Sequence, residues 1–344
     1  MTATARQIRI CLVLLGLLYG LVLLAGPIAP YSPAEQHRDS PFAPPARLHF
    51  VDAAGRFHAR PFVYSLAGRT GRFGEYDEDR TERHPIRVLI HGAPYTIAGM
   101  FAGDRHLFGL DAPAALFLCG SDQFGRDVLS RLLFGGQISL VAGLMAATLA
   151  LTLGLALGGL AGFYGGWTDD AIMRTAELVL ALPWLYLLFA IRAVLPLHLD
   201  PVRAFLLIVA VIGIVGWARP ARLIRSLVLS ATRREHVVAA RACGATDPYL
   251  LRRHVLPQTA GLVLTQLAVL IPQYILAEVT LSFFGLGVGE PVPSWGTMLA
   301  AAQRYDVLVS YWWMLLPGIA LTPVFLLYYA LANALHRQFG LVSQ

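Results

Sequence analysis

Six apolar runs, each close to the length needed to cross a bilayer, limit this chain to few folds. A membrane-spanning helix needs about 20 consecutive apolar residues. The composition agrees, because 56% of the 344 residues are hydrophobic and only 14% are charged, against about 25% charged in soluble domains. We therefore predict an all-α polytopic membrane protein with six transmembrane helices. The runs are Ile10–Ala29, Ile138–Phe163, Ala176–Leu195, Phe205–Ala218, Gly261–Phe283 and Trp312–Leu335.

Three of these runs depart from a simple straight span. Pro183 lies inside the third run and predicts a kink, because proline removes a backbone donor. The fourth run is short, so we expect its helix to begin earlier or to continue beyond the membrane face. For the first run a secretory signal peptide is the alternative, although prolines crowd Gly26–Pro30 and make it a poor cleavage site.

The placement of arginine predicts the orientation of the spans. Arg219–Arg253 carries eight arginines and two acids, and short loops rich in positive charge stay in the cytoplasm. Counting spans from this loop places both termini inside and the long segment after the first span outside. Arg6, Arg9 and Arg337 agree with this orientation. We expect residues 1–30 to hold the N-terminus and first span, 31–133 an external insert, and 134–344 five spans with a cytoplasmic loop at 219–257.

All 27 basic residues are arginine, and the absence of lysine excludes two kinds of chemistry. A phosphate-binding loop of the G-x-x-x-x-G-K-[ST] type requires lysine, and so does a Schiff base. The net charge of +6 does not indicate nucleic acid, since no basic stripe with interleaved aromatic residues is present. Cys11, Cys119 and Cys243 lie far apart, so neither a disulfide nor a zinc site is expected.

The external insert, residues 31–133, predicts a small β-rich domain. Its first part is rich in proline and should be extended. The rest contains short alternating segments and a glycine turn, which is typical of a hairpin. We expect strands at His49–Val51, Arg56–Tyr64, Ile86–Ile90 and Tyr95–Ile97, and a mixed-charge loop at Arg72–Arg83.

The second span carries three glycines on one helix face. Gly154, Gly158 and Gly162 recur every four residues, and such a face lets another helix approach closely. We expect tight packing inside the same helix bundle. A direct pore-lining role is the alternative.

A polar, arginine-rich segment, Arg234–Pro257, separates the fourth and fifth spans. Glu235, Ala239 and Ala240 fall on one side of a helix, where the small alanines leave a shallow surface that a partner's side chains can fill. Gly244 permits a sharp bend, because it lacks a Cβ. We interpret the segment as a small helix–turn–helix outside the membrane, gripped by another protein.

The second half of this segment predicts a helix over Pro248–Val255. Pro257 is expected to end it, because proline cannot donate its backbone hydrogen bond. The alternative for the whole segment is an interfacial amphipathic helix, whose arginines reach toward anionic lipid.

The same segment resembles the EAA loop of binding-protein-dependent ABC importer permeases. That pattern has glutamate, two alanines and glycine at fixed spacing, followed by nine residues and an isoleucine-x-leucine-proline end. Glu235, Ala239, Ala240, Gly244, Leu256 and Pro257 occupy its positions. His254 stands where the pattern usually has isoleucine.

Other stretches are similar to one branch of this family, the second permease subunit of dipeptide and oligopeptide importers. The matches cover nearly everything from Gly120 to the C-terminus, and the first span. The external stretch 48–118 is longer than this branch usually carries. The matching stretches are Gly120–Arg131, Ala161–Arg174, Leu281–Gly287 and Pro293–Gly296.

This resemblance implies a type I ABC importer permease fold in the bacterial inner membrane, with a periplasmic insert between the first two helices. It implies a heterodimer with a second permease subunit that forms the translocation path, in contact with membrane lipid. Two ATPase subunits would bind ATP and grip the coupling loops, so this chain would need no cofactor. A periplasmic solute-binding protein would deliver di- or oligopeptides; nickel or another small solute is the alternative.

Several polar and aromatic residues outside the loop have their own expectations. Asp122, Arg126 and Asp127 should form an ion-pair and capping arrangement where the second span begins. Glu278, near the outer end of the fifth span, is either a buried functional residue or lies at the headgroup level. An interfacial aromatic belt is expected at Trp295, Trp312 and Trp313.

Two other classes of protein were weighed against a permease. A membrane enzyme with an external catalytic loop would use the histidines there, but they form no H-E-x-x-H motif or triad. These histidines are His49, His58, His84, His91 and His106. A secondary transporter would need acids in mid-span, where this chain has almost none.

Overall fold

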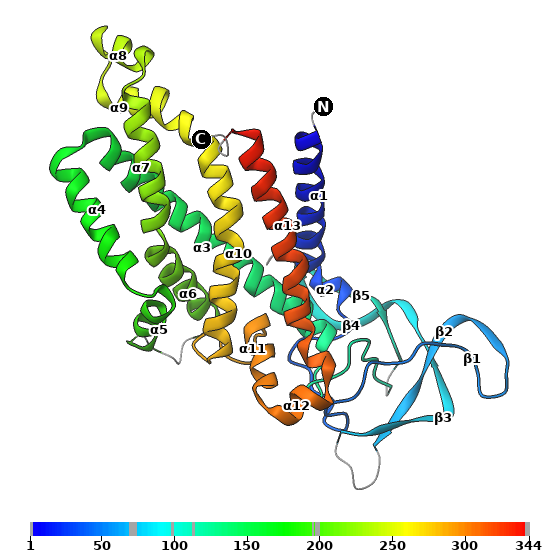
Figure 1. Cartoon of the computed structure of the whole chain (residues 1–344). Helices are drawn as coiled ribbons and strands as arrows, with labels where there is room; N and C mark the ends of the chain where they lie inside the picture. Colours follow the sequence, from blue (N-terminus) through cyan, green and yellow to red (C-terminus); the bar gives the residue numbers. More distant parts are fainter. Residues whose placement is uncertain are drawn as a thin grey trace. The chain divides into compact units, whose positions relative to one another are not determined.

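The computed structural model describes residues 3–68, 74–97, 100–111, 114–194, 196 and 200–340. The chain forms two compact units. The first comprises the described residues within 1–15, 140–281 and 322–344, and the second those within 16–139 and 282–321. The unit boundaries fall within the helices α1, α3, α10 and α13. All five strands belong to the second unit (Figure 1).

Four helices in the described part of the chain are long and apolar enough to cross a membrane. They are α1 (Ala3–Leu23), α3 (Val128–Tyr164), the run Asp247–Phe283 ending in α10 (Ala260–Phe283), and the run Trp312–Gln338 ending in α13 (Leu316–Gln338). The number rises to six if two bent pairs each count as one span. The predicted helical membrane class is therefore confirmed, with four to six candidate spans.

The two bent pairs correspond to the two runs that were expected to be irregular. α4 (Gly166–Ala181) and α5 (Trp184–Val194) meet at 91° around Pro183, which confirms the break there. α6 (Pro201–Gly216) and α7 (Ala218–Thr232) meet at 43°. The fourth run thus begins earlier and continues further than its apolar residues, as expected for a run too short to span.

Close packing of α3 against α7 organises the first unit. A Cβ built on Gly158 would lie 2.3 Å from the carbonyl oxygen of Ala221, and one on Gly162 would lie 2.7 Å from that of Arg225. The glycines therefore allow backbone contact within one bundle, which confirms the packing interpretation of this face. α4 packs on α7 around buried Ala176 and Ala221, and the two helices run side by side in Figure 1.

The segment between α7 and α10 forms two helical pieces joined by a turn. α8 (Glu235–Ala242) is followed by α9 (Asp247–Leu250), a π-helical turn (Leu251–Val255) and a 3-10 turn (Leu256–Thr259) that leads into α10. The expectation that Pro257 ends the second helix was wrong. Pro257 lies in the first positions of the 3-10 turn, where its missing N–H does not interrupt the helix.

The second unit holds two small antiparallel sheets, one with the order β1-β2-β3 and one pairing β4 with β5. The predicted hairpin is confirmed, with Phe62, Val63 and Tyr64 buried. The two strands predicted at Ile86–Ile90 and Tyr95–Ile97 are one strand, Arg87–Ile97. The strands are β1 (His49–Val51), β2 (Phe57–Gly68), β3 (Tyr76–Pro85), β4 (Arg87–Ile97) and β5 (Phe101–Gly109).

The mixed-charge stretch predicted as a loop was the clearest error in this insert. Its described part from Tyr76 onward belongs to β3, which pairs with β2 through Phe62↔Pro85 and Gly68↔Tyr76. Most of β3 is exposed, so its side chains do not show the alternation that marks a half-buried strand. Arg72 itself lies outside the described residues.

Short helices complete the second unit: α2 (Ala25–Ile28), α11 (Trp295–Ala300), α12 (Tyr305–Ser310) and the 3-10 turns Ala301–Gln303 and Trp312–Leu315. Two tryptophans there contradict the predicted aromatic belt. Trp295 and Trp313 are 3% and 6% exposed. Their indole nitrogens donate to the carbonyls of Leu132 at 2.9 Å and Ser121 at 3.0 Å. They are core residues anchored by hydrogen bonds, and Trp312 alone of the three stays exposed.

Candidate functional site

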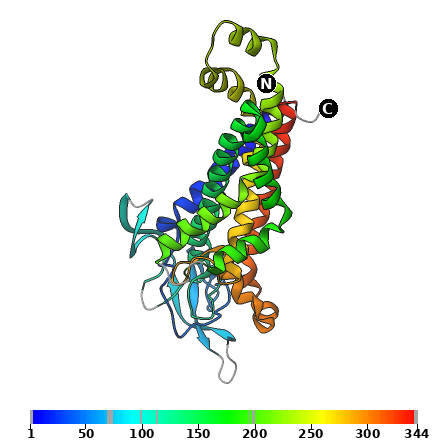
Figure 2. The same ribbon diagram turned by 90° about the vertical axis from the view of Figure 1, so that its left-hand side faces the viewer.

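The loop between α7 and α10 presents the small side chains that the sequence singled out. Glu235 and Ala239 are exposed on α8, and Ala240 is half-buried. Val237 is buried and holds the opposite side of α8. Val238 is 55% exposed, so an apolar side chain lies beside the alanines. Figure 2 shows the α8–α9 segment projecting past the ends of the long helices of its unit.

Gly244 ends α8 with a specific backbone arrangement. Its φ is +88°, its N–H donates to the carbonyl of Arg241 at 3.0 Å, and the N–H of Ala245 donates to the carbonyl of Ala240 at 3.1 Å. This pair of bonds is the Schellman motif, which places a left-handed residue after the last helical turn. A residue with a Cβ is disfavoured in that conformation, so glycine fixes the angle between α8 and α9.

The second half of the loop is anchored to the bundle by its apolar side chains. Leu250 and Val255 are fully buried, and Leu256 is half-buried. Pro257, in contrast, is exposed. The side chains of Arg241 and Asp247 form an ion pair across the turn at 3.2 Å. Both are about half-exposed, so this pair adds little stability.

One ion pair at the base of this loop was not predicted. Both guanidinium nitrogens Nε and Nη2 of Arg225, on α7, donate to the carboxylate of Asp169, on α4. This bidentate pairing is the strong geometry for arginine and carboxylate. It ties the helix that enters the loop to the helix pair broken at Pro183. The two positions lie 56 residues apart, and no motif or spacing in the sequence relates them.

A cavity of about 370 Å³ lies where the bent helices of the first unit meet. It is mostly apolar, with Arg219, Gln273 and Tyr274 as its polar side chains. The Tyr274 hydroxyl donates to the carbonyl of Gly216 at 3.0 Å, at the point where α6 turns into α7. Sequence reasoning missed this cavity, because its walls come from five separate helices, α4, α5, α6, α7 and α10.

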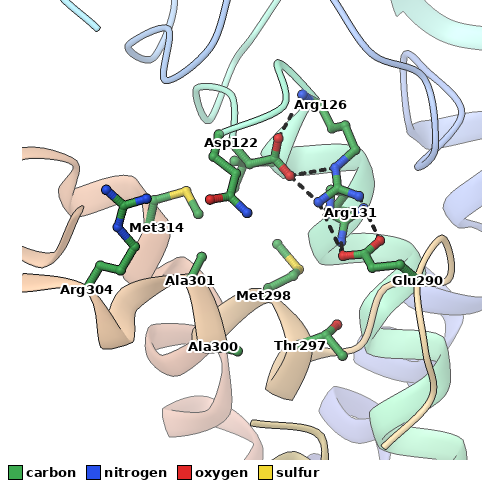
Figure 3. Close-up of a pocket in the computed structure, with 12 residues that line it drawn as sticks. Asp122, Arg126, Arg131, Glu290, Thr297, Met298, Ala300, Ala301, Arg304 and Met314 are labelled. Atoms are coloured by element: carbon green, nitrogen blue, oxygen red, sulfur yellow. Dashed lines mark hydrogen bonds and ion pairs between the residues drawn. The ribbon is translucent and has the colours of Figure 1, made fainter. Parts of the chain in front are cut away.

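The second unit contains a buried cluster of charges at the start of α3. Asp122 accepts from Nε of Arg126 at 2.7 Å. Asp127 precedes α3 and accepts from the Ser130 N–H at 2.7 Å, so both the ion pair and the cap were predicted correctly. Burial raises the pKa of Asp127 to about 7, against the lowering effect of the Ser130 hydrogen bonds. Arg131 and Glu290 complete the cluster (Figure 3) and were not predicted.

Other candidate residues have plainer environments. Glu278 is fully buried in α10, and its depth in the membrane stays a prediction. The rings of His236 and His254 lie 6.2 Å apart. Among the residues that the structure describes, no three His, Cys, Asp or Glu side chains lie close enough together to hold a metal ion.

Comparison with known proteins places these features in context. The sequence model of the family described as "Binding-protein-dependent transport system inner membrane component" matches residues 154–340. The chain is 34% identical over 203 residues to the dipeptide transport system permease protein DppC of Bacillus subtilis (strain 168), covering 59% of this chain and 61% of that protein. It is 38% identical over 196 residues to the oligopeptide transport system permease protein OppC of the same organism, covering 57% and 62%.

A third relative is named for the transport of glutathione. The chain is 33% identical over 228 residues to the glutathione transport system permease protein GsiD of Pectobacterium atrosepticum, covering 66% of this chain and 72% of that protein. The match to the two Bacillus proteins spans about three fifths of their length.

Proposed function

The chain belongs to the family of binding-protein-dependent transport system inner membrane components, and from this premise we propose that it is a permease subunit of an ATP-driven importer of short peptides. The peptide cargo is supported by the chain's similarity to dipeptide, oligopeptide and glutathione transport permeases. Residues 31–133 would then form the periplasmic insert and 134–344 the permease core.

We propose further that α8 and its flanking turn dock on an ATPase subunit. The observation that carries this proposal is the exposed face of α8, with Glu235, Ala239 and Val238, held at a fixed angle by Gly244. Exposed apolar side chains next to small residues suit a partner that fills the surface. The loop would lie in the cytoplasm, as its arginines indicate, with both termini on the same side.

The remaining partners follow from the family. A second permease subunit would complete the translocation path, and a periplasmic solute-binding protein would deliver the peptide. Two ATPase subunits would supply the energy, because no P-loop is available in a chain without lysine. Each ATPase would move one coupling loop, and in this chain the Asp169–Arg225 pair would carry that motion from α7 to α4.

The test replaces one exposed alanine by a large side chain. Ala239→Trp keeps α8 intact, because the position faces solvent, yet it would block a partner surface that closes on the alanine. We expect the variant to reach the membrane normally but to lose ATPase binding and ATP-dependent dipeptide uptake in proteoliposomes with all partners present. The matched control is Ala102→Trp, at an exposed alanine of β5. Wild-type ATPase binding by Ala239→Trp would refute the docking proposal.

A further inference from the structure

In the second unit, the partly exposed carboxylate of Glu290 forms ion pairs with two buried arginines, Arg126 and Arg131. The side chains of Arg126 and Arg131 are 8% and 2% exposed, whereas that of Glu290 is 51% exposed. Arg126 donates to both Glu290 oxygens, at 2.7 and 3.3 Å. Arg131 donates to Oε1 at 3.1 Å. Two guanidinium groups thus clamp one carboxylate from the interior side (Figure 3).

The two acids of this cluster are held in different ways. Asp122 is buried and accepts from the backbone N–H groups of Phe124 and Arg126 as well as from the arginine side chain. Among the described residues, the carboxylate of Glu290 is held by the two arginines only. Asp122 is therefore built into the fold, whereas Glu290 is attached through groups that any carboxylate could use.

An unfilled space adjoins the clamp. The cavity has a volume of about 270 Å³, and Met298 and Met314 line it together with the arginines (Figure 3). Methionine is flexible and apolar, so it adapts to side chains of different shape. A ligand with a carboxylate at one end and an apolar group beside it would fit both walls.

Charge balance links the departure of Glu290 to the arrival of another anion. With Glu290 in place, Arg126 and Arg131 are balanced by Asp122 and Glu290. If Glu290 left without a replacement, a buried arginine would lose its carboxylate partner, which is strongly unfavourable. A second carboxylate that replaced it would restore the balance, and the planar arginine fork suits such a group.

We propose that this cavity is a carboxylate-binding site in which Glu290 is the resident, exchangeable occupant. Its ligand is the C-terminal carboxylate of a short peptide, with the last side chain packed against Met298 and Met314. The choice of a peptide rests on the proposed function, whereas the carboxylate site itself rests on the clamp and the cavity.

The test removes the resident carboxylate and keeps its shape. The intact permease complex in lipid nanodiscs, without ATP, is titrated by equilibrium dialysis with labelled glycyl-leucine and with glycyl-leucinamide, which lacks the carboxylate. We expect Glu290→Gln to bind glycyl-leucine at least about tenfold more tightly than wild type, because a tethered competitor acts at millimolar effective concentration. The amide should bind no better in the variant.

Asp111→Asn is the matched control, since Asp111 pairs with Arg87 at 2.7 Å on an exposed surface without this cavity. It should leave binding unchanged. Glu290→Ala repeats the test without an amide side chain, and the thermal midpoint of each variant reports folding. Equal affinity of wild type and both Glu290 variants, or an equal gain with the amide, would overturn the proposal. The assay measures binding and not transport. A complex that failed to import peptides could therefore still show or lack the carboxylate site.

Discussion

Substitution of Gly244 separates the effect of the backbone angle from that of side-chain contacts in the α8–α9 segment. The residue has φ +88°, and no heavy atom lies within 4 Å of a Cβ built on it. A side chain there meets no steric clash, so the whole effect comes from the left-handed conformation. That conformation costs a residue with a Cβ about 1–2 kcal/mol. Asparagine tolerates it far better than a β-branched residue does.

The size of the expected effect follows from how docking depends on the loop. Apparent affinity falls in proportion to the fraction of molecules in the binding-competent conformation. A change of 1–2 kcal/mol therefore weakens ATPase binding by about 5- to 30-fold. We expect Gly244→Val to show this full loss and Gly244→Asn to lose less than about threefold.

The assay is the affinity of the ATPase subunits for the permease complex in nanodiscs, with binding-protein-stimulated ATP hydrolysis as a second readout. Gly55→Val is the control, because Gly55 has φ +80° and equally open surroundings in the β1–β2 hairpin. The control should leave ATPase affinity unchanged. Equal affinities for Gly244→Val and Gly244→Asn would show that the Schellman turn does not set the docking geometry.

Two further predictions concern stability. Gly158→Ala should lower the thermal midpoint in detergent, because its Cβ would lie 2.3 Å from the Ala221 carbonyl oxygen and such overpacking costs about 1–3 kcal/mol. The control Gly159→Ala, whose Cβ would lie 3.5 Å from its nearest neighbour, should leave the midpoint unchanged or raise it. Equal midpoints for the two variants would contradict this reasoning. Burial raises the pKa of Asp127 above its ordinary value, to about 7, so its neutral form favours folding below about pH 4 and that stability is lost as pH rises to 7. Asp127→Asn should therefore flatten the fall in midpoint between about pH 4 and pH 7, and an unchanged slope would refute the assignment.

The sequence identified what depends on composition and local pattern. Long apolar runs mark helices because backbone groups in lipid must bond internally, and this holds for α1, α3, α10 and α13. Gly244 was found because a glycine between two helix-forming stretches has few other reasons to be there. The glycine face of α3 was also readable, since its period places Gly154, Gly158 and Gly162 on one side.

Features set by contacts between distant residues were not readable. α3 begins ten residues before the predicted start, because the charge of Arg131 is neutralised by Asp122 and Glu290 rather than exposed. Trp295 was expected at a membrane interface, yet its indole N–H donates a hydrogen bond to the carbonyl of Leu132 in α3. Both errors share a cause: a polar group that looks solvated in sequence can be satisfied inside the fold.

The helical run that joins the α8–α9 segment to α10 is long enough to carry a rotation from one end to the other. Asp247–Phe283 is a single run of 37 residues, about 55 Å long at 1.5 Å per residue. A rigid helix of this length moves one end by about 5 Å when it rotates by about 5° about its other end. If an ATPase subunit held the Asp247 end, as proposed above, a rotation of this size would displace the Phe283 end by about the width of an extended peptide backbone.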